Sequence, residues 1–434
     1  MNLDSAPLTV FVVTHTHWDR EWYHSAVRFR QRLIPLVDAL LAALPDEPPF
    51  LLDGQAILLE DYLAICPTGR EALTNALRRG RIEAGPWYVL ADELVPGGEA
   101  LIRNLLAGRR VLDHLGGAAP AVLYSPDAFG HPASLPLLAA SFGIQLAVLW
   151  RGLGGPEWPD GDSFRWVAAD GSSVIVHHLP PAGYEFGSNL PREPQAAEAR
   201  WKEIERTMVP RARLGALLLL NGADHHWPQR DLQHAVDALA QAADPCVVRR
   251  TGLRAFAETL VERAGIADLP QIRGELRASF GYTWSLQGTL AVRAPLKGRA
   301  VRLERELLRD VEPWLALAGG SFDVPPRALE HAAWKTLLRC HPHDTLCGCS
   351  IDAVAHAMAA RLESAEEQAR GLRHDAIGAL LGYDPDAAIG RRADWRPSVV
   401  VRNRAPRARS GVAEMEILTF IRDVPVGPDS AWAQ

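Results

Sequence analysis

The sequence of 434 residues has few cysteines, almost no lysine and no long apolar run. Its five cysteines are sparse and odd in number, which favours a reducing compartment over a disulfide-stapled secreted fold. Neither the basic nor the apolar region of a signal peptide follows Met1, and no apolar run approaches the roughly 20 residues that span a bilayer. The sequence therefore predicts a cytoplasmic protein with no membrane segment.

An excess of positive charge is absent as well. The net charge of −6 and the pI near 6.2 exclude a basic surface for nucleic acid. Only three of the 46 Lys and Arg residues are Lys, which we attribute to genome composition. A hydrophobic content of 48% in a chain of this length allows two or three domains with substantial cores. This composition is compatible with a homo-oligomer and leaves the number of subunits open.

Residues 1–264 alternate short apolar runs with amphipathic segments, which favours βα units and an α/β domain with a parallel sheet or barrel. The predicted strands are Thr9–Val13, Phe50–Leu52, Trp87–Leu90, Ala121–Tyr124, Leu146–Trp150, Ala216–Leu220 and Cys246–Val248. The predicted helices are Leu33–Leu44, Ala56–Ile65, Glu99–Leu115, Ser134–Phe142, Gln229–Ala242 and Leu253–Ala264. Between them, Ser163–Leu179 has the pattern of a hairpin with its turn at Asp170-Gly171.

Strand signals stop at about residue 265, and residues 265–384 predict a small helical bundle. Its expected helices are Arg293–Leu317, Pro326–Arg339 and Ile351–Leu381, the last with Ser350 as its N-cap. In residues 385–434 the pattern changes again, to two predicted strands at Pro397–Asn403 and Gly411–Thr419. Since two lone strands cannot form a stable sheet, we expect these last residues to begin a β-rich domain that the chain leaves incomplete.

Side chains suited to catalysis follow four of the predicted strands. Chemistry collects at the carboxyl ends of strands in parallel α/β folds. The segment Thr14–Trp22, with the sequence THTHWDREW, directly follows the first strand. Its alternating His and Asp side chains can turn nitrogen and oxygen atoms toward one point, as a divalent metal such as zinc requires. The other three strand ends carry Asp127, Arg151 and Asp224.

Each of these residues also has a purely structural interpretation. Asp127 and Asp224 could be turn or N-cap residues, and Arg151 could pair with a buried carboxylate, although an Arg beside two aspartates would also keep one of them ionised. The paired histidines outside the first motif are expected to be structural: His225 and His226 would support Asp224, and His177 and His178 would end a hairpin strand.

The helical region contains one further cluster, Cys340–Ser350, with the sequence CHPHDTLCGCS. Its cysteines and histidines could form a self-contained structural zinc site. The C-x-C spacing does not match the usual zinc-finger pairs. We therefore expect instead that one of the two histidines reaches back to a metal held by His17 and Asp19.

These motifs resemble those of the α-mannosidases of glycoside hydrolase family 38, over nearly the whole chain. His15-Thr16-His17-Trp18-Asp19 matches the first family motif, and its continuation to Trp22 is similar to the bacterial branch, which includes mannosylglycerate hydrolases. The other three motifs are matched in order by Asp127-Ala128-Phe129-Gly130-His131, Asn221-Gly222-Ala223-Asp224-His225 and His341-Pro342-His343-Asp344. Such members normally continue through several hundred more residues of β-structure, so the chain resembles a family member truncated at its C-terminus.

The resemblance implies a distorted barrel-like α/β domain, a three-helix bundle and then β-sandwich domains. It implies zinc bound by His17, Asp19, Asp127 and His343, with Asp127 also the nucleophile and Asp224 the general acid/base. Further residues implied to contact the sugar or tune the carboxylate are Trp22, Arg151 and Asp344.

The implied activity is that of a zinc-dependent retaining α-mannosidase, which forms a covalent glycosyl-aspartate intermediate. A retaining enzyme needs two carboxyl groups roughly 5–5.5 Å apart, one to attack and one to protonate the leaving oxygen. The substrate would be an oligosaccharide or a mannosylglycerate-like α-mannoside. Two alternatives stay open: an inactive sugar-binding remnant, and a metal-dependent amidohydrolase or deacetylase that uses His177 or His178 and a zinc-activated water.

Overall fold

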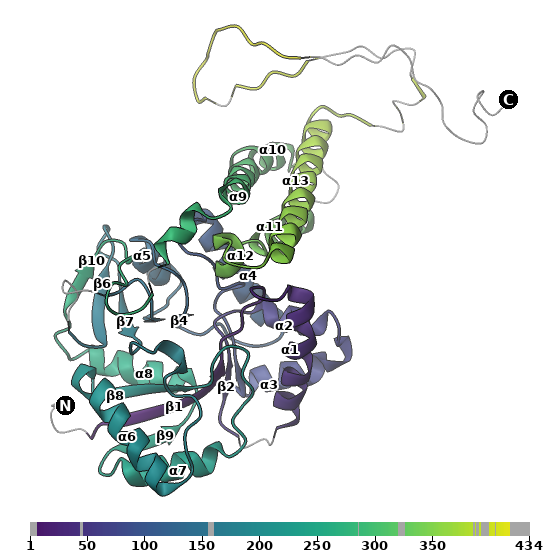
Figure 1. Ribbon diagram of the computed structural model, residues 1–434. Helices are drawn as coiled ribbons and strands as arrows, with labels where there is room; N and C mark the ends of the chain where they lie inside the picture. The colour runs from purple at the N-terminus through teal and green to yellow at the C-terminus, as the bar shows by residue number, and fades with distance from the viewer. Residues whose placement is uncertain are drawn as a thin grey trace. The chain divides into compact units, whose positions relative to one another are not determined.

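The structure is a computed structural model that describes residues 7–43, 47–154, 160–284, 286–319, 326–384, 387, 390–391, 399–403 and 405–416. The chain divides into two compact units, Met1–Gly382 and Tyr383–Gln434. The first unit contains an α/β part and a helical part (Figure 1).

Strand β1 (Thr9–Thr16) is the central strand of the first sheet, and all eight of its residues are buried. It pairs in parallel with β8 (Ala216–Asn221), β9 (Val247–Arg250) and β2 (Phe50–Leu52), and β2 pairs with β3 (Ile82–Glu83). Because these pairings are all parallel, the carboxyl ends of the strands meet at one side of the sheet. His17 and Asp224 meet there in an isolated parallel bridge.

The second sheet has the order β10-β6-β7-β5-β4. Its strands are β4 (Val122–Ser125), β5 (Leu146–Leu149), β6 (Ser163–Val167), β7 (Ser173–His178) and β10 (Gln271–Arg273). The β6–β7 pair is antiparallel, which confirms the predicted hairpin, and the other pairs are parallel. Strand β10 was not expected; its three residues are too few to show a pattern, and they extend the α/β part beyond residue 264.

A glycine lets the two sheets approach closely where the candidate site lies. Gly54 follows β2, and a Cβ added there would lie 2.2 Å from the carbonyl oxygen of Tyr124 in β4. Only a residue without a side chain fits such an approach. The close contact brings Asp53, just before this glycine, toward the loop that carries Asp127.

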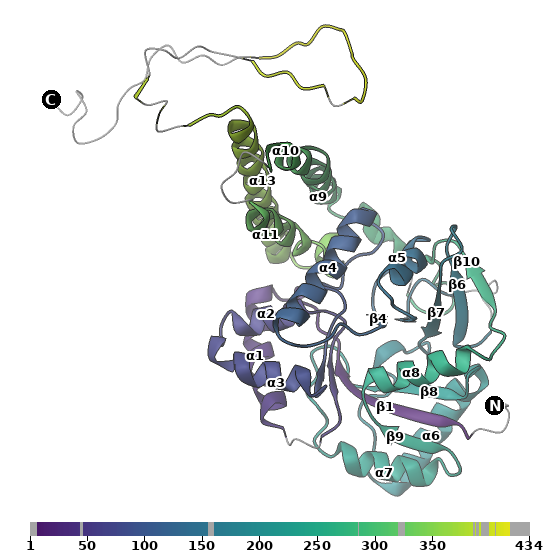
Figure 2. The same cartoon turned by 180° about the vertical axis from the view of Figure 1, so that it is seen from behind.

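Helices cover the sheets because side chains alternate along the strands. Val10 and Val12 of β1 pack in one core cluster with α6 and α7, whereas Phe11 and Val13 pack in another with Phe256 of α8. Figures 1 and 2 show these helices on the two sides of the first sheet. The helices of the α/β part are α1 (Ala26–Ala42), α2 (Ile57–Leu63), α3 (Arg70–Arg78), α4 (Gly98–His114), α5 (Leu135–Ser141), α6 (Pro194–Met208), α7 (Leu232–Ala242) and α8 (Leu253–Ala264), with 3-10 turns η2 (Pro67–Gly69), η3 (Gly183–Glu185) and η4 (Val209–Arg211).

The strand predicted at Trp87–Leu90 is wrong. The backbone N–H groups of Tyr88 and Val89 donate to the side-chain oxygen of Asn104, at 2.8 and 3.0 Å, instead of to a neighbouring strand. A buried side chain on α4 therefore satisfies the backbone that a sheet partner would otherwise satisfy. Only an isolated bridge, Gln55 to Trp87, remains in this segment.

The helical part is a three-helix bundle around one apolar core. Its first helix is continuous from α9 (Ala294–Glu306) through the π-helical turn η6 (Leu307–Val311) to α10 (Glu312–Ala318). The 3-10 turn η5 (Gln287–Ala291) precedes it. The other two helices are α11 (Arg327–Leu338) and α13 (Asp352–Leu380), joined through the short α12 (His343–Cys347). The predicted N-cap is wrong: Ile351 takes that position, because Ser350 Oγ donates to the carbonyl of Asp344 at 2.8 Å. An α/β fold followed by a helical domain is otherwise confirmed.

The second unit contributes little regular structure among its described residues. Residues 399–403 and 411–416 form no strand, so the strands predicted at Pro397–Asn403 and Gly411–Thr419 are not formed there; the rest of both ranges lies outside the described residues. A strand is stable only when neighbouring strands form hydrogen bonds with its backbone. Within the described part of the chain, no helix combines the length and the apolar character that crossing a membrane requires.

Candidate active site

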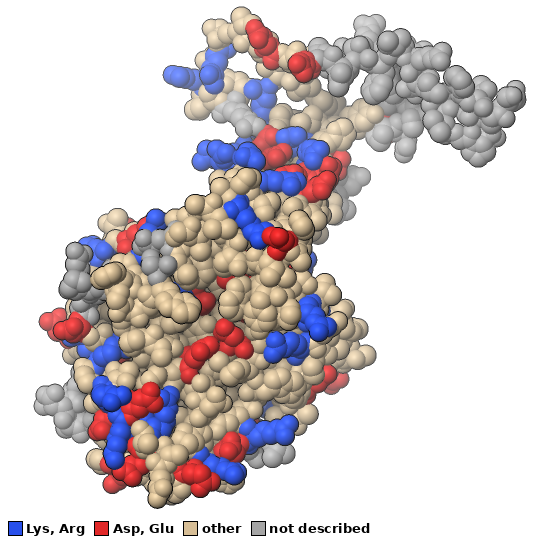
Figure 3. Space-filling model, in the orientation of Figure 1, with Lys and Arg blue, Asp and Glu red and all other residues tan. Residues whose placement is uncertain are grey.

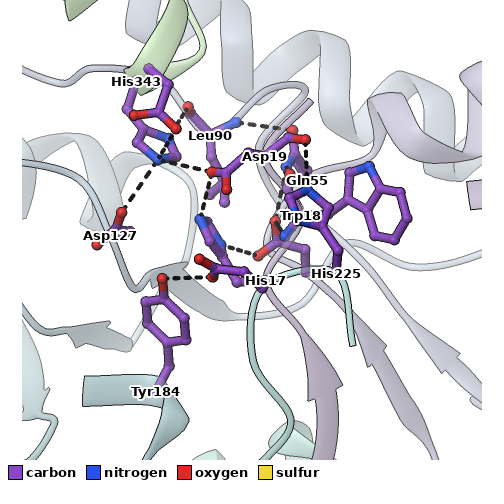
Figure 4. Close-up of polar contacts among 12 residues, drawn as sticks. His17, Trp18, Asp19, Gln55, Leu90, Asp127, Tyr184, His225 and His343 are labelled. Atoms are coloured by element: carbon purple, nitrogen blue, oxygen red, sulfur yellow. Dashed lines mark hydrogen bonds and ion pairs between the residues drawn. The ribbon is translucent and has the colours of Figure 1, made fainter. Parts of the chain in front are cut away.

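Four side chains from distant parts of the sequence meet at one point. His17 and Asp19 follow β1, Asp127 follows β4, and His343 begins α12. The Nε2 atom of His17 lies 3.0 Å from Asp19 Oδ1, and Nε2 of His343 lies 3.4 Å from the same oxygen and 3.6 Å from Asp127 Oδ2. Figure 4 shows these side chains pointing toward one another. The structure therefore brings together the four residues that the sequence motifs predicted to share a metal.

The atoms at the centre of this cluster have no hydrogen-bond partner. His17 Nε2, Asp19 Oδ1 and His343 Nε2 are buried and close together, but they are not aligned as hydrogen bonds. Buried polar atoms without a partner are rare and costly. Two imidazole nitrogens and carboxylate oxygens also form a donor set that suits zinc. The residues present therefore fit a metal ion held by His17, Asp19, Asp127 and His343.

Other buried groups hold the two histidines. His17 Nδ1 lies 3.4 Å from Asp53 Oδ1, while Oδ2 of Asp53 accepts hydrogen bonds from the Trp18 N–H and from Gln55. His343 Nδ1 lies 3.3 Å from the carbonyl of Leu90. A partner on the second ring nitrogen is typical of a histidine that ligates a metal, because it fixes the orientation of the ring.

Neighbouring charges reverse the effect of burial on these groups. Burial alone would lower the pKa of His17, but the carboxylates of Asp19 and Asp53 raise it well above its usual value. The pKa of Asp19 is lowered despite its burial, because both histidines face it. The carboxylates of the cluster therefore favour a positive charge at this point, either as a proton on a histidine or as a bound cation.

Asp127 is held by an arginine. Arg151 Nε donates to Asp127 Oδ1 at 2.6 Å, and a second guanidinium nitrogen donates to Thr283. Although burial would raise the pKa of Asp127, the nearby His343 ring, with Nε2 at 3.6 Å from Oδ2, and the charge of Arg151 lower it below the usual value. Arg151 and His343 thus both favour the ionised form of Asp127.

A buried network supports the loop that carries Asp127. Trp87 Nε1 donates to Ser125 Oγ, which donates to Glu93 at 2.8 Å. The other carboxylate oxygen of Glu93 lies 2.7 Å from His131 Nδ1. Ser125 and His131 stand on either side of Asp127, so Glu93 ties both ends of this loop together. Sequence reasoning missed Glu93, which has no local motif.

Asp224 lies beside the cluster with different electrostatics. One of its oxygens is within 4.8 Å of ligand atoms of His17 and Asp19. Burial raises the pKa of Asp224 to about 6, so its carboxyl is protonated more readily than that of Asp127. Tyr184 donates a hydrogen bond to Asp224 Oδ1 at 2.8 Å. No motif in the sequence pointed to Tyr184, which lies in the short turn η3, 40 residues from Asp224.

Asp344 also faces the cluster. Its Oδ2 lies 3.6 Å from His343 Nε2, and its Oδ1 accepts a hydrogen bond from the thiol of Cys349 at 2.9 Å. Burial raises the pKa of Asp344 to about 8. Cys347 donates instead to Asp92. Among the described residues, the groups that could hold an ion contain no cysteine, which disfavours a self-contained zinc site here.

Several predicted residues lie outside the cluster. Trp22 is partly exposed, its ring contacts Tyr23, and its carbonyl accepts from the N–H of Ile351 at the start of α13. His177 and His178 are buried on β7, where His178 Nε2 contacts the carbonyl of Trp150. Burial lowers the pKa of both histidines to about 3, which favours their neutral form, and both ring nitrogens of His177 are without a hydrogen-bond partner.

The residues of the cluster differ in exposure. In the space-filling view, acidic side chains lie in and beside a hollow on the α/β part (Figure 3). The side chains of Asp127 and Asp19 are 13% and 3% exposed. Asp127 is thus the more accessible of these two carboxylates.

The profile described as glycosyl hydrolases family 38 N-terminal domain matches residues 7–275, and that of the alpha mannosidase middle domain matches residues 285–380. A Halalkalibacterium halodurans protein named "Putative mannosylglycerate hydrolase" is 33% identical over 82% of this chain and 41% of its own length. The crystal structure of an alpha-mannosidase from Enterococcus faecalis V583 superposes with a TM-score of 0.82 and 31% identity, over 86% of this chain and 43% of that one. Human alpha-mannosidase 2C1 is 24% identical over 87% of this chain and 35% of its own length. The chain spans less than half the length of these relatives.

Proposed function

Because the chain belongs to glycosyl hydrolase family 38, we propose that it hydrolyses α-mannosides with retention of anomeric configuration. The observation that carries this proposal is the convergence of two carboxyl groups, those of Asp127 and Asp224, on one cluster of candidate metal ligands. The pKa of Asp127 is lowered and that of Asp224 is raised to about 6. A retaining glycosidase needs such a difference, since one carboxylate attacks while the other donates a proton.

We assign the zinc ligands as His17, Asp19, Asp127 and His343, whose atoms converge and in part have no hydrogen-bond partner. When bound, the ion would orient the substrate and stabilise charge at the reacting sugar. The relatives named above suggest mannosylglycerate or another α-mannoside as the substrate.

The chain's own residues divide the remaining work. The Asp127 carboxylate, kept ionised by Arg151, would attack the anomeric carbon and form a glycosyl ester. Asp224 would give its proton to the leaving oxygen and then take one from the incoming water. Tyr184, whose hydroxyl donates to Asp224, would hold the carboxyl in place through both steps.

The two alternatives make different use of these residues. The amidohydrolase would need His177 or His178 as a ligand, yet neither is in the groups of described residues that could hold an ion. This observation disfavours it. An inactive sugar-binding remnant would keep the cluster without turnover, and it is separated from the enzyme only by experiment.

The test is a screen of the purified, zinc-loaded chain against α-mannosides with different leaving groups, including an aryl α-mannoside and mannosylglycerate. We expect hydrolysis of at least one, with one zinc per chain by elemental analysis. Turnover of an N-acetyl substrate with none of a mannoside would support the amidohydrolase. Bound zinc and mannose without turnover would support the remnant.

A further inference from the structure

Two buried residues of the motif Thr14–Trp22 have no part in the proposed function. Arg20 and Glu21 directly follow the candidate ligand Asp19, and they are 7% and 1% exposed. Residues 18–25 belong to no helix or strand, so the backbone hydrogen bonds of a sheet or helix do not fix this loop. Because buried charges are costly without partners, the contacts of these two side chains show what holds the loop.

Arg20 attaches the loop to the α/β part. Its Nε atom donates to Asp61 Oδ2 at 2.8 Å, and a second guanidinium nitrogen donates to Asp61 Oδ1 at 3.2 Å. Asp61 belongs to α2. This contact does not involve the helical part, which supplies the candidate ligand His343.

Glu21 attaches the same loop to the helical part. Two guanidinium nitrogens of Arg361, in α13, donate to Oε1 and Oε2 of Glu21 at 2.7 and 2.6 Å. Thr345 Oγ1 donates to Oε2 of Glu21 at 3.0 Å. Both carboxylate oxygens therefore have partners, and an arginine paired with a carboxylate through two hydrogen bonds is one of the stronger contacts in proteins. Glu21 is in none of the groups of described residues that could hold an ion, so its role is not that of a ligand.

Thr345 lies in the same helix as the candidate ligand His343. Helix α12 has five residues, which is too few for a helix that is stable by itself. The N–H of His343 donates to the carbonyl of Leu90 at 2.9 Å, which holds the first residue of α12. The bond from Thr345 to Glu21 adds a second point of attachment, and it leads directly to the loop of Asp19. His343 Nε2 and Asp19 Oδ1 are 3.4 Å apart, so a shift between α12 and this loop would change the spacing of two ligands.

We propose that Glu21 is a positioning residue for the metal site, which holds Asp19 and His343 at the spacing that a shared ion requires. It acts through Thr345, which fixes α12, and through Arg361, which fixes the orientation of the Glu21 carboxylate. Hydrogen bonds around the ligands of a metal typically strengthen its binding, because they keep the ligands in place before the ion arrives. The proposal rests on the proposed function in one respect, since it takes Asp19 and His343 as zinc ligands.

The test compares the same substitution in two ion pairs of the full chain. Arg361→Lys keeps the positive charge but cannot donate to both oxygens of Glu21 in the same geometry. Arg299→Lys is the matched control, because Arg299 donates to the two oxygens of Glu366 in α13, at 2.6 and 2.7 Å. Glu366 is in none of the candidate ion sites among the described residues. Competition with a chromophoric chelator measures zinc affinity, and denaturant unfolding of the metal-free chain measures stability.

We expect Arg361→Lys to weaken zinc binding about 10-fold, at the lower end of the loss typical of outer-shell partners, and Arg299→Lys to leave it unchanged. The visible spectrum of Co²⁺ bound in place of zinc should change only in Arg361→Lys, because it depends on the arrangement of the ligands. Thr345→Val, which removes the hydroxyl and keeps the shape, should also weaken zinc binding, and it decides the question should Arg361→Lys fail to fold.

Three results would overturn the proposal: unchanged zinc affinity in Arg361→Lys, unchanged zinc affinity in Thr345→Val, or the same loss of affinity in Arg361→Lys and Arg299→Lys. A wild-type chain that binds no zinc would overturn the ligand assignment and this proposal together. Hydrolysis of an aryl α-mannoside, measured in parallel, tests the proposed function separately, because zinc affinity is measured without turnover.

Discussion

Two buried assemblies of histidine and carboxylate lie side by side in this protein, and their hydrogen bonding differs. In the candidate metal cluster, His17 Nε2 and Asp19 Oδ1 are 3.0 Å apart but are not hydrogen-bonded. In the network under the Asp127 loop, Glu93 lies 2.7 Å from His131 and accepts from Ser125. The chemical groups are the same, and only the alignment of their atoms separates the two.

The comparison distinguishes residues that can bind a ligand from residues that stabilise a loop. A carboxylate whose oxygens are both satisfied by the protein stabilises a loop, whereas atoms that converge without partners leave room for a ligand. The two assemblies meet at the loop that carries Asp127: Glu93 holds Ser125 and His131 in this loop, and Asp127 Oδ2 lies 3.6 Å from His343 Nε2. Variants in each assembly should therefore have different consequences.

The largest expected effect belongs to Asp127. We expect Asp127→Ala to lower hydrolysis of an aryl α-mannoside by at least about 10⁴-fold, because it removes the proposed nucleophile. A mechanism-based inhibitor that labels the wild-type chain should leave a covalent mass increase on the peptide containing Asp127. Mass spectrometry and initial rates measure both effects.

Glu93→Gln is the matched control for Asp127→Ala, because it alters the supporting network and leaves the proposed nucleophile in place. We expect it to retain labelling and to lose only about 10- to 100-fold in rate, the usual scale for an outer-shell partner. Equal losses of hydrolysis rate in Asp127→Ala and Glu93→Gln would contradict the assignment of Asp127 as the nucleophile and of Glu93 as a supporting residue.

The next effect concerns the metal. His343→Ala should weaken zinc binding by at least about 10²-fold, because a ligand contributes more than the outer-shell partners that typically cost 10–100-fold. His341→Ala is the matched control, since His341 lies two residues away, is equally buried, and lies 3.6 Å from Glu304 instead of in the cluster. Competition with a chromophoric chelator measures both affinities. Equal zinc affinity in the two variants would contradict the ligand set.

A smaller effect is expected from the proposed acid. Burial raises the pKa of Asp224 to about 6, so the proton it donates is present below this value and lost as the pH rises through it. The kcat/KM for a poor leaving group should therefore fall on the alkaline side in the wild type. Asp224→Asn should lower it about 10²- to 10⁴-fold and flatten that limb. An alkaline limb that survives in Asp224→Asn would assign the proton to another residue.

Much of the candidate site could be predicted because its residues stand at strand ends or in short motifs. His17, Asp19, Asp127 and Asp224 follow β1, β4 and β8, and such positions are readable from apolar runs. Tyr184 could not be predicted, because only the packing of a distant turn brings it to Asp224.

The difference between local motifs and distant contacts also explains the errors in the predicted fold. Trp87–Leu90 has the composition of a strand, but the side chain of Asn104 satisfies its backbone, and no local pattern reveals that. Strand β10 forms only because Gln271–Arg273 meets β6. Local patterns therefore predicted strands and helices that have a clear apolar or amphipathic run, and they failed for short segments whose conformation one distant contact decides.

The smallest effect is expected outside the cluster, at a buried carboxyl group of the helical bundle. Glu304 of α9 accepts from the N–H of Gly97, and burial raises its pKa to about 7. The folded chain therefore holds this proton more tightly than the unfolded chain, so Glu304 destabilises the fold increasingly as the pH rises from about 4.5 through 7. Glu304→Gln keeps an acceptor for Gly97 without the charge and should stabilise the chain at pH 8 by up to about 3 kcal/mol, but not at pH 4. Denaturant unfolding at both pH values measures the difference; a gain that is the same at both would mean that packing, and not the charge of Glu304, limits the stability of the bundle.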